Sequence, residues 1–227
     1  MDFVEEQGVY IIANGTFNPA IFHPSWLAKN GIITSDEEES ATIDVVHSDI
    51  SRFQIPSLRF DVQQERVAIH ASIQPFVRIA DVFAAIFGEK LRHSPMTSAG
   101  INFWVHFQLK SWEQRQKLGR LLAPIEPWGG FGKLMENSDK DLAGGFSTLA
   151  MRAHFGEYGE SGAINVSVQP STKVIGNSGV FTSVNSHFAH NEQNTEKLVA
   201  EIYNNFDSCL KRARGIVTEM ISLGRSL

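Results

Sequence analysis

Apolar and polar residues alternate most regularly in residues 100–109, which read GINFWVHFQL. Every second side chain of this stretch is apolar, and the positions between them carry Asn102, Trp104, His106 and Gln108. A two-residue period predicts a β-strand with one face in a core. A tryptophan and a histidine on the other face are unexpected, because a solvated strand face more often carries residues such as threonine or lysine. This face is the first candidate for function.

The same two-residue period predicts six further strands, in two groups of three. These strands span residues 43–45, 58–62, 67–73, 149–155, 164–168 and 180–188. Apolar residues at helical spacing predict helices at 76–93, 111–124 and 193–222. The second of these helices begins with a capping-box signature in Ser111 and Gln114, and Pro124 ends it.

These elements predict an α+β fold with a largely antiparallel sheet, built from two strand-strand-strand-helix units with the helices packed on one face. Parallel strands buried on both faces would give continuous apolar runs instead of alternation. The two units are expected at 41–124 and 143–223, after an irregular N-terminal segment at 1–40. Sheets joined edge to edge, with both helices on one side, bury the most surface, so we expect a single domain over residues 1–227.

Three segments lack a clear period. A short helical piece is expected at residues 24–31, and the acidic run at 36–39 is interpreted as a solvated loop. Residues 125–136 combine apolar side chains at helical spacing with three glycines, so we expect a loop with a short turn there. These glycines match neither a P-loop nor a dinucleotide-binding pattern.

Composition indicates which partners and which cellular compartment are expected for the protein. The chain has 227 residues, a net charge of -5 and one cysteine, Cys209. An acidic total gives no electrostatic reason to expect nucleic acid or a membrane surface as a partner, although a local basic patch is compatible with it. A single cysteine on an apolar helical stripe predicts a buried, inert thiol. The sequence has neither a signal peptide nor a membrane span, so a cytoplasmic protein is expected.

The polar positions of the predicted strands gather on one face of the sheet. Because neighbouring strands lie about 4.8 Å apart, side chains from several strands can meet on that face. It carries large aromatic and guanidinium groups, which are enriched at binding hot spots. An ordinary solvated sheet face is the competing interpretation. The candidate binding residues are Asn102, Trp104, His106, Arg152, His154, Asn185 and His187.

Three functions are compatible with this face. The first is a non-catalytic accessory or interaction protein that presents the Trp104 face to a protein partner or to another copy of itself. The second is the binding of a small polar ligand. The third, less favoured, is a hydrolase with a metal ion held by His106, His154 and His187. Because the sequence contains no HExxH, CxxC or nucleophile-elbow motif, we expect no catalytic residue, no metal and no cofactor.

Three stretches carry a resemblance to other proteins: GINFWVHF, LGRLLAPIEPW and YNNFDSCLKRARGIVTEMI. With their order of G-I-N, H-F, L-A-P and tryptophan, they resemble an uncharacterised family of bacterial proteins. The resemblance covers about two thirds of the chain. It implies a bacterial source and brings no active site with it.

Overall fold

A computed structural model describes residues 4–136, 144–154, 162–190 and 193–227 of the chain. These residues form one nine-stranded antiparallel sheet with helices packed on it, which confirms the predicted α+β class. The strands are β1 (Val4–Gly15), β2 (Thr42–Val46), β3 (Ile50–Gln54), β4 (Arg59–Gln63), β5 (Arg66–Ala71), β6 (Met96–Gln108), β7 (Leu149–His154), β8 (Gly162–Pro170) and β9 (Gly179–Ala189). The α-helices are α1 (Pro24–Lys29), α2 (Ser35–Glu39), α3 (Val77–Ala84), α4 (Trp112–Leu122), α5 (Gly129–Glu136) and α6 (Thr195–Ser226). Shorter helical turns are η1 (Pro19–Ile21), η2 (Ala85–Lys90) and η3 (Glu126–Trp128), of which η2 is a π-helix.

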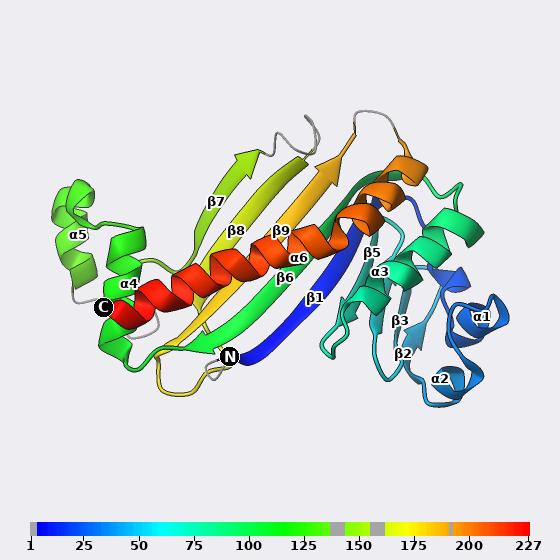
Figure 1. The fold of residues 1–227 in the computed structure, drawn as a ribbon, viewed down its shortest axis with the longest axis horizontal. Coiled ribbons are helices and arrows are strands. Elements are labelled where there is room, and N and C mark those ends of the chain that lie inside the picture. The colour runs from blue at the N-terminus through cyan, green and yellow to red at the C-terminus, as the bar shows by residue number, and fades with distance from the viewer. Residues whose placement is uncertain (1–3, 137–143, 155–161, 191–192) are drawn as a thin grey trace.

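The two halves of the sheet follow the same plan. The strand order is β2-β3-β4-β5-β1-β6-β9-β8-β7, with the long strands β1 and β6 side by side at the centre (Figure 1). In each half, a central strand leads into helices and then into a meander. The last strand of the meander, β5 or β9, returns to pair with the central strand and is followed by a helix, α3 in the first half. In the second half this helix is α6.

The prediction of an irregular N-terminal segment is wrong for residues 4–15, which form the central strand β1. Its inward side chains Val9, Ile11 and Ala13 are fully buried. The alternate positions carry Tyr10 and Ile12, which are also apolar or aromatic and only partly exposed. With apolar residues on both faces, the strand has no visible alternation, as is typical of strands covered on both sides.

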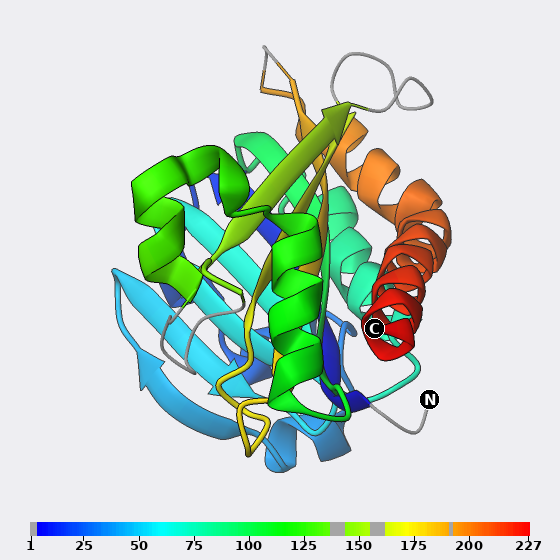
Figure 2. The same ribbon diagram turned by 90° about the vertical axis from the view of Figure 1, so that its left-hand side faces the viewer.

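Helices α3 and α6 cover one face of the sheet. The long helix α6 crosses β6 and β9, and α3 lies beside it over β1 and β5 (Figure 1). The turned view places both helices on the same side of the strands (Figure 2). The apolar stripe of α6 is buried against the sheet, and Cys209 is buried on it, as its position predicted. The opposite side of the sheet, which we call the open face, carries the candidate residues.

Two loops of the sequence prediction are helical. Residues 36–39 belong to α2, where the Thr34 hydroxyl accepts from the Glu37 N–H and the Glu37 carboxylate accepts from the Thr34 N–H. This capping box stabilises a short helix, none of whose residues is buried. Residues 129–136 form α5, and Gly132 is needed there because a Cβ atom would lie 2.2 Å from the Ile125 carbonyl oxygen.

The remaining predicted elements fall on observed ones, and β3 is an unpredicted strand of the first meander. The last residue of the strand predicted at 149–155, and residues 156–161 after it, lie outside the described residues. Within the described helices, none is long and apolar enough to cross a membrane.

Candidate functional site

The candidate residues of the sequence all point to the open face, but they spread across it. Asn102 of β6 pairs with Asn185 of β9, which pairs through Asn165 with Arg152 of β7. Three strand spacings, roughly 14 Å, therefore separate Asn102 from Arg152. Arg152 and His154 are exposed on the edge strand. They are not brought together with Trp104.

The three histidines proposed for a metal site lie apart. His106 is opposite Phe181, whereas His187 is opposite Gly100, six positions further along the strand pair. Six residues of strand span roughly 20 Å. His154 is two strands away from His187, with Ala163 between them. Within the described ranges, no three His, Cys, Asp or Glu side chains are grouped so that they could hold a metal ion. This arrangement gives no support to the metal hydrolase hypothesis.

Trp104 and His106 lie on the open face, opposite the apolar row of β6, but each is only 8% exposed. Gly8 of β1 leaves room for the tryptophan, because a Cβ atom there would lie 2.8 Å from Trp104 Cζ2. The β8–β9 connection covers the histidine, with Ser171 Oγ 2.7 Å from His106 Nδ1. Sheet neighbours and this connection together bury side chains that a single strand would leave exposed.

Five rings from four strands form a continuous row across the open face, which we call the ring row. Tyr10 and His70 stack at 4.2 Å between ring centroids, and Trp104 lies 5.8 Å from His70. His106 follows at 5.6 Å from Trp104, and Phe181 at 4.7 Å from His106. Sequence reasoning did not select Tyr10, His70 or Phe181 as site residues, because their proximity depends on the strand order. The ring row gives the open face a large stacking surface.

Two adjoining hollows lie along the ring row. The first, which we call the central hollow, has a volume of about 390 Å³ and is lined by Glu6, Tyr10, Ile12, His70, Asn102, Trp104, His106, Lys173, Phe181 and Ser183. The second, the arginine hollow, has a volume of about 520 Å³ and is lined by Tyr10, Ile12, Arg52, Arg59, Asp61, Arg66, Ala68 and His70. The two share Tyr10, Ile12 and His70, so they adjoin at these side chains, and we call them together the depression.

Four buried polar atoms on the open face have no hydrogen-bond partner among the described residues. They are His70 Nε2, Asn102 Nδ2, Trp104 Nε1 and Asn185 Oδ1. Trp112 Nε1 of α4 also has none, but it does not lie on this face. Folded proteins pair nearly all such atoms, since an unpaired one costs about 1–3 kcal/mol. Three of the four belong to residues that line the central hollow, namely His70, Asn102 and Trp104, and Asn185 is the strand neighbour of Asn102.

Burial also sets the charge state of the site. It lowers the pKa of His70, and Arg59 lowers it further. Burial likewise lowers the pKa of His106, against the opposing effect of Glu6. The pKa of the Tyr10 hydroxyl is raised, chiefly by burial. Near neutral pH, the rings therefore act as uncharged hydrogen-bonding groups, each histidine with one donor and one acceptor nitrogen.

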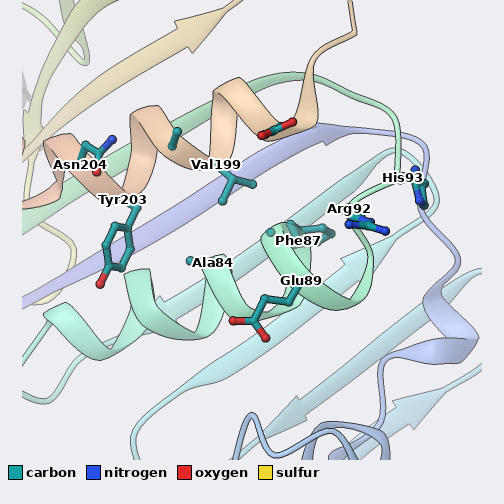
Figure 3. A pocket seen from close by; sticks show the side chains of 11 residues that line it. Ala84, Phe87, Glu89, Arg92, His93, Val199, Tyr203 and Asn204 are labelled. Carbon is teal, nitrogen blue, oxygen red and sulfur yellow. The ribbon is translucent and has the colours of Figure 1, made fainter.

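A third hollow lies on the other side of the sheet, in a groove between η2 and α6 (Figure 3). It measures about 620 Å³, and Phe87 and Val199 form an apolar floor between the two helices. Glu89 and Arg92 line it from the side of η2, and Tyr203 lines it from α6 (Figure 3). Of its lining side chains, none has a buried polar atom without a partner. This groove is larger than the central hollow, but it has no unpaired buried polar atom that would indicate a bound ligand.

The site therefore offers a stacking surface, unpaired donors and acceptors, and guanidinium groups at one end. This combination suits non-covalent recognition. No family model matches the chain, and no curated protein matches it.

Proposed function

We propose that the protein binds a small, flat, polar molecule in the central hollow. The observation that carries this proposal is the cluster of four unpartnered polar atoms beside the ring row. A hollow with an apolar wall and a few placed polar groups is the usual form of a ligand site. The function is the small-ligand alternative of the sequence analysis.

The chemistry of the hollow defines the ligand. Trp104 Nε1 and Asn102 Nδ2 of the hollow are donors, and Asn185 Oδ1, on the neighbouring strand opposite Asn102, is an acceptor. His70 Nε2 takes either role according to its tautomer. Each atom is shielded from water by its neighbours, so the ligand has to displace a ring edge or a side-chain amide to reach it. A heterocycle with donors and acceptors along its edge meets these requirements and stacks on the rings.

A protein-interaction function is the second candidate, and another part of the molecule supports it. Trp128, Phe131 and Leu134, in η3 and α5, are 62%, 57% and 73% exposed. An exposed apolar helix face of this kind is typical of a contact surface for a partner or a second copy. Both functions agree with the cytoplasmic location and the bacterial source expected from the sequence.

The primary proposal is tested by nuclear magnetic resonance of the tryptophan indole N–H groups. Substitution Trp104→Phe assigns the Trp104 signal, and a panel of flat heterocycles, beginning with adenine, nicotinamide and 2-quinolone, is then titrated. We expect members of the panel to shift the Trp104 signal saturably and to leave the signal of the exposed Trp128 in place. If every compound leaves Trp104 unmoved, or if Trp128 responds equally, the proposal is wrong.

A further inference from the structure

We propose that the ligand carries an oxyanion, a carboxylate or a phosphate, and that Arg59 and Arg66 bind it in the arginine hollow. This inference rests on the proposed function, since it assigns the second half of the same depression. The arginine hollow continues the central hollow past Tyr10 and His70. A molecule that stacks on the ring row therefore extends directly toward the arginines.

The charges of the arginine hollow do not cancel. Arg52 Nε lies 2.8 Å from Asp61 Oδ2, and this aspartate also accepts from Gln63. Arg59 pairs with Asp44 at 3.2 Å, and both side chains are about half exposed. Arg66 is exposed and forms no ion pair with any other described residue. Three guanidinium groups thus face two carboxylates, which leaves one positive charge in excess, although the whole chain carries a charge of -5.

The register of the sheet places these arginines within reach of a ligand on the ring row. Arg59 of β4 is opposite His70 of β5, which is opposite Tyr10 of β1. Two strand spacings, roughly 10 Å, separate Tyr10 from Arg59. Arg66 lies on β5 itself, opposite Asn14 of β1. A flat ring with an acidic group on a short chain has the right length to join the two hollows.

Guanidinium groups are suited to this role. The planar fork of arginine donates two parallel N–H bonds to a carboxylate or a phosphate, which gives orientation as well as affinity. Arg59 and Arg66 also act electrostatically on Tyr10, where they oppose the effect of burial on the pKa of its hydroxyl. Their charge therefore reaches the shared wall of the two hollows.

The opposite end of the depression carries no excess charge. Glu6 and Lys173 both line the central hollow there, and the Glu6 carboxylate lies 4.0 Å from Lys173 Nζ. These two charges cancel, whereas the arginine end carries an excess positive charge that attracts an oxyanion. The ligand consequently binds in one orientation, with its acidic group toward β4 and β5.

The test compares an anionic probe with a neutral probe of nearly the same shape, indole-3-propionate and indole-3-propionamide. Both are titrated against the full chain, with the Trp104 indole signal as readout. We expect the acid to bind at least about tenfold more tightly than the amide, and this ratio to shrink as salt is added. Substitutions Arg66→Gln and Arg59→Gln should each reduce the ratio. Arg92→Gln, in the groove of Figure 3, removes an equal charge elsewhere and should leave it unchanged.

The outcomes separate the inference from the function on which it rests. If acid and amide shift the Trp104 signal with equal affinity, the site binds ligands but the oxyanion assignment is wrong. If Arg92→Gln reduces the ratio as much as Arg66→Gln, the effect belongs to net charge and the assignment is also wrong. If neither probe moves Trp104, whereas other flat heterocycles do, the arginine hollow is not part of the site. Failure of the whole heterocycle panel would instead contradict the proposed function. A parallel titration with 3-indolyl phosphate distinguishes a phosphate site from a carboxylate site.

Discussion

Both faces of the sheet carry rows of aromatic side chains, but the hydrogen bonding of their buried polar groups differs. On the face covered by α3 and α6, Phe60, Phe103 and Phe107 are at most 2% exposed. Two buried polar residues on this side of the sheet have partners: Ser51 donates to the Phe22 carbonyl, and the Thr182 hydroxyl lies 3.3 Å from Met220 Sδ. On the open face, Trp104 and His106 are also buried and the other three rings are partly exposed, yet four neighbouring polar atoms are unpaired. Burial alone does not distinguish a core from a site, whereas the pairing of buried polar atoms does.

The largest effect is expected from loss of the covering helix. A chain that ends at residue 191 lacks α6, whose buried stripe runs from Leu198 to Val217. Exposing this side of β6 and β9 should abolish folding, because one side of the core would face water. Circular dichroism and thermal melting measure the result. If the shortened chain is soluble and melts cooperatively, α6 is a detachable element and not the cover of the core.

The next effect concerns a single ring on the covered face. Phe107 is fully buried in the core cluster. Substitution Phe107→Ala should lower the free energy of unfolding by about 3–5 kcal/mol, through lost transfer energy and an unfilled cavity. Urea denaturation gives the value. A loss below about 1 kcal/mol would mean that this face is loosely packed and that the contrast between the faces is wrong.

The pH dependence of stability distinguishes the open face in a different way. Burial lowers the pKa of His70, His106 and His187 in the folded protein. The unfolded chain therefore binds more protons, and stability is complete above the unfolded value of about 6.5 and falls as the pH drops below it. Urea denaturation at pH 7.5 and 5.5 measures this change. Substitution His106→Gln should reduce the fall, with His47→Gln, at an exposed position, as the control. Stability that is constant or rises between pH 7.5 and 5.5 would contradict the account.

The smallest effect on stability is expected at α5. Phe131 is 57% exposed, so Phe131→Ser should change the free energy of unfolding by no more than about 0.5 kcal/mol. If α5 contacts a second copy, the same substitution should lower the molar mass measured by light scattering. If the native protein is already a monomer, the substitution leaves the molar mass unchanged. Self-association through α5 would then have no support.

The sequence predicted the elements that have one apolar face and missed those that do not. Strands such as β6 and helices such as α6 bury one side only, so their period is visible along the chain. Strand β1 is central and flanked by rings, and β3 places Ser51 inside, so neither alternates cleanly. In the site, Asn102, Trp104 and His106 were selected because they share one strand. Tyr10 and His70 could not be selected, because their contact depends on the pairing of β1 with β5, strands far apart in sequence.

In the proposed function, the ring row of the open face serves binding, whereas the covered face serves stability. Substitution Trp104→Phe tests it most directly, because phenylalanine keeps an aromatic ring and removes the unpaired Nε1 donor. Calorimetric titration with indole-3-propionate and thermal melting should be performed on the same sample, with Phe107→Leu of the covered face for comparison. We expect about tenfold weaker binding in Trp104→Phe, with a melting temperature within a few degrees of the native protein. In Phe107→Leu we expect unchanged binding and a lower melting temperature. Unchanged binding in Trp104→Phe, together with a stability loss as large as that of Phe107→Leu, would identify Trp104 as a core residue and contradict the account.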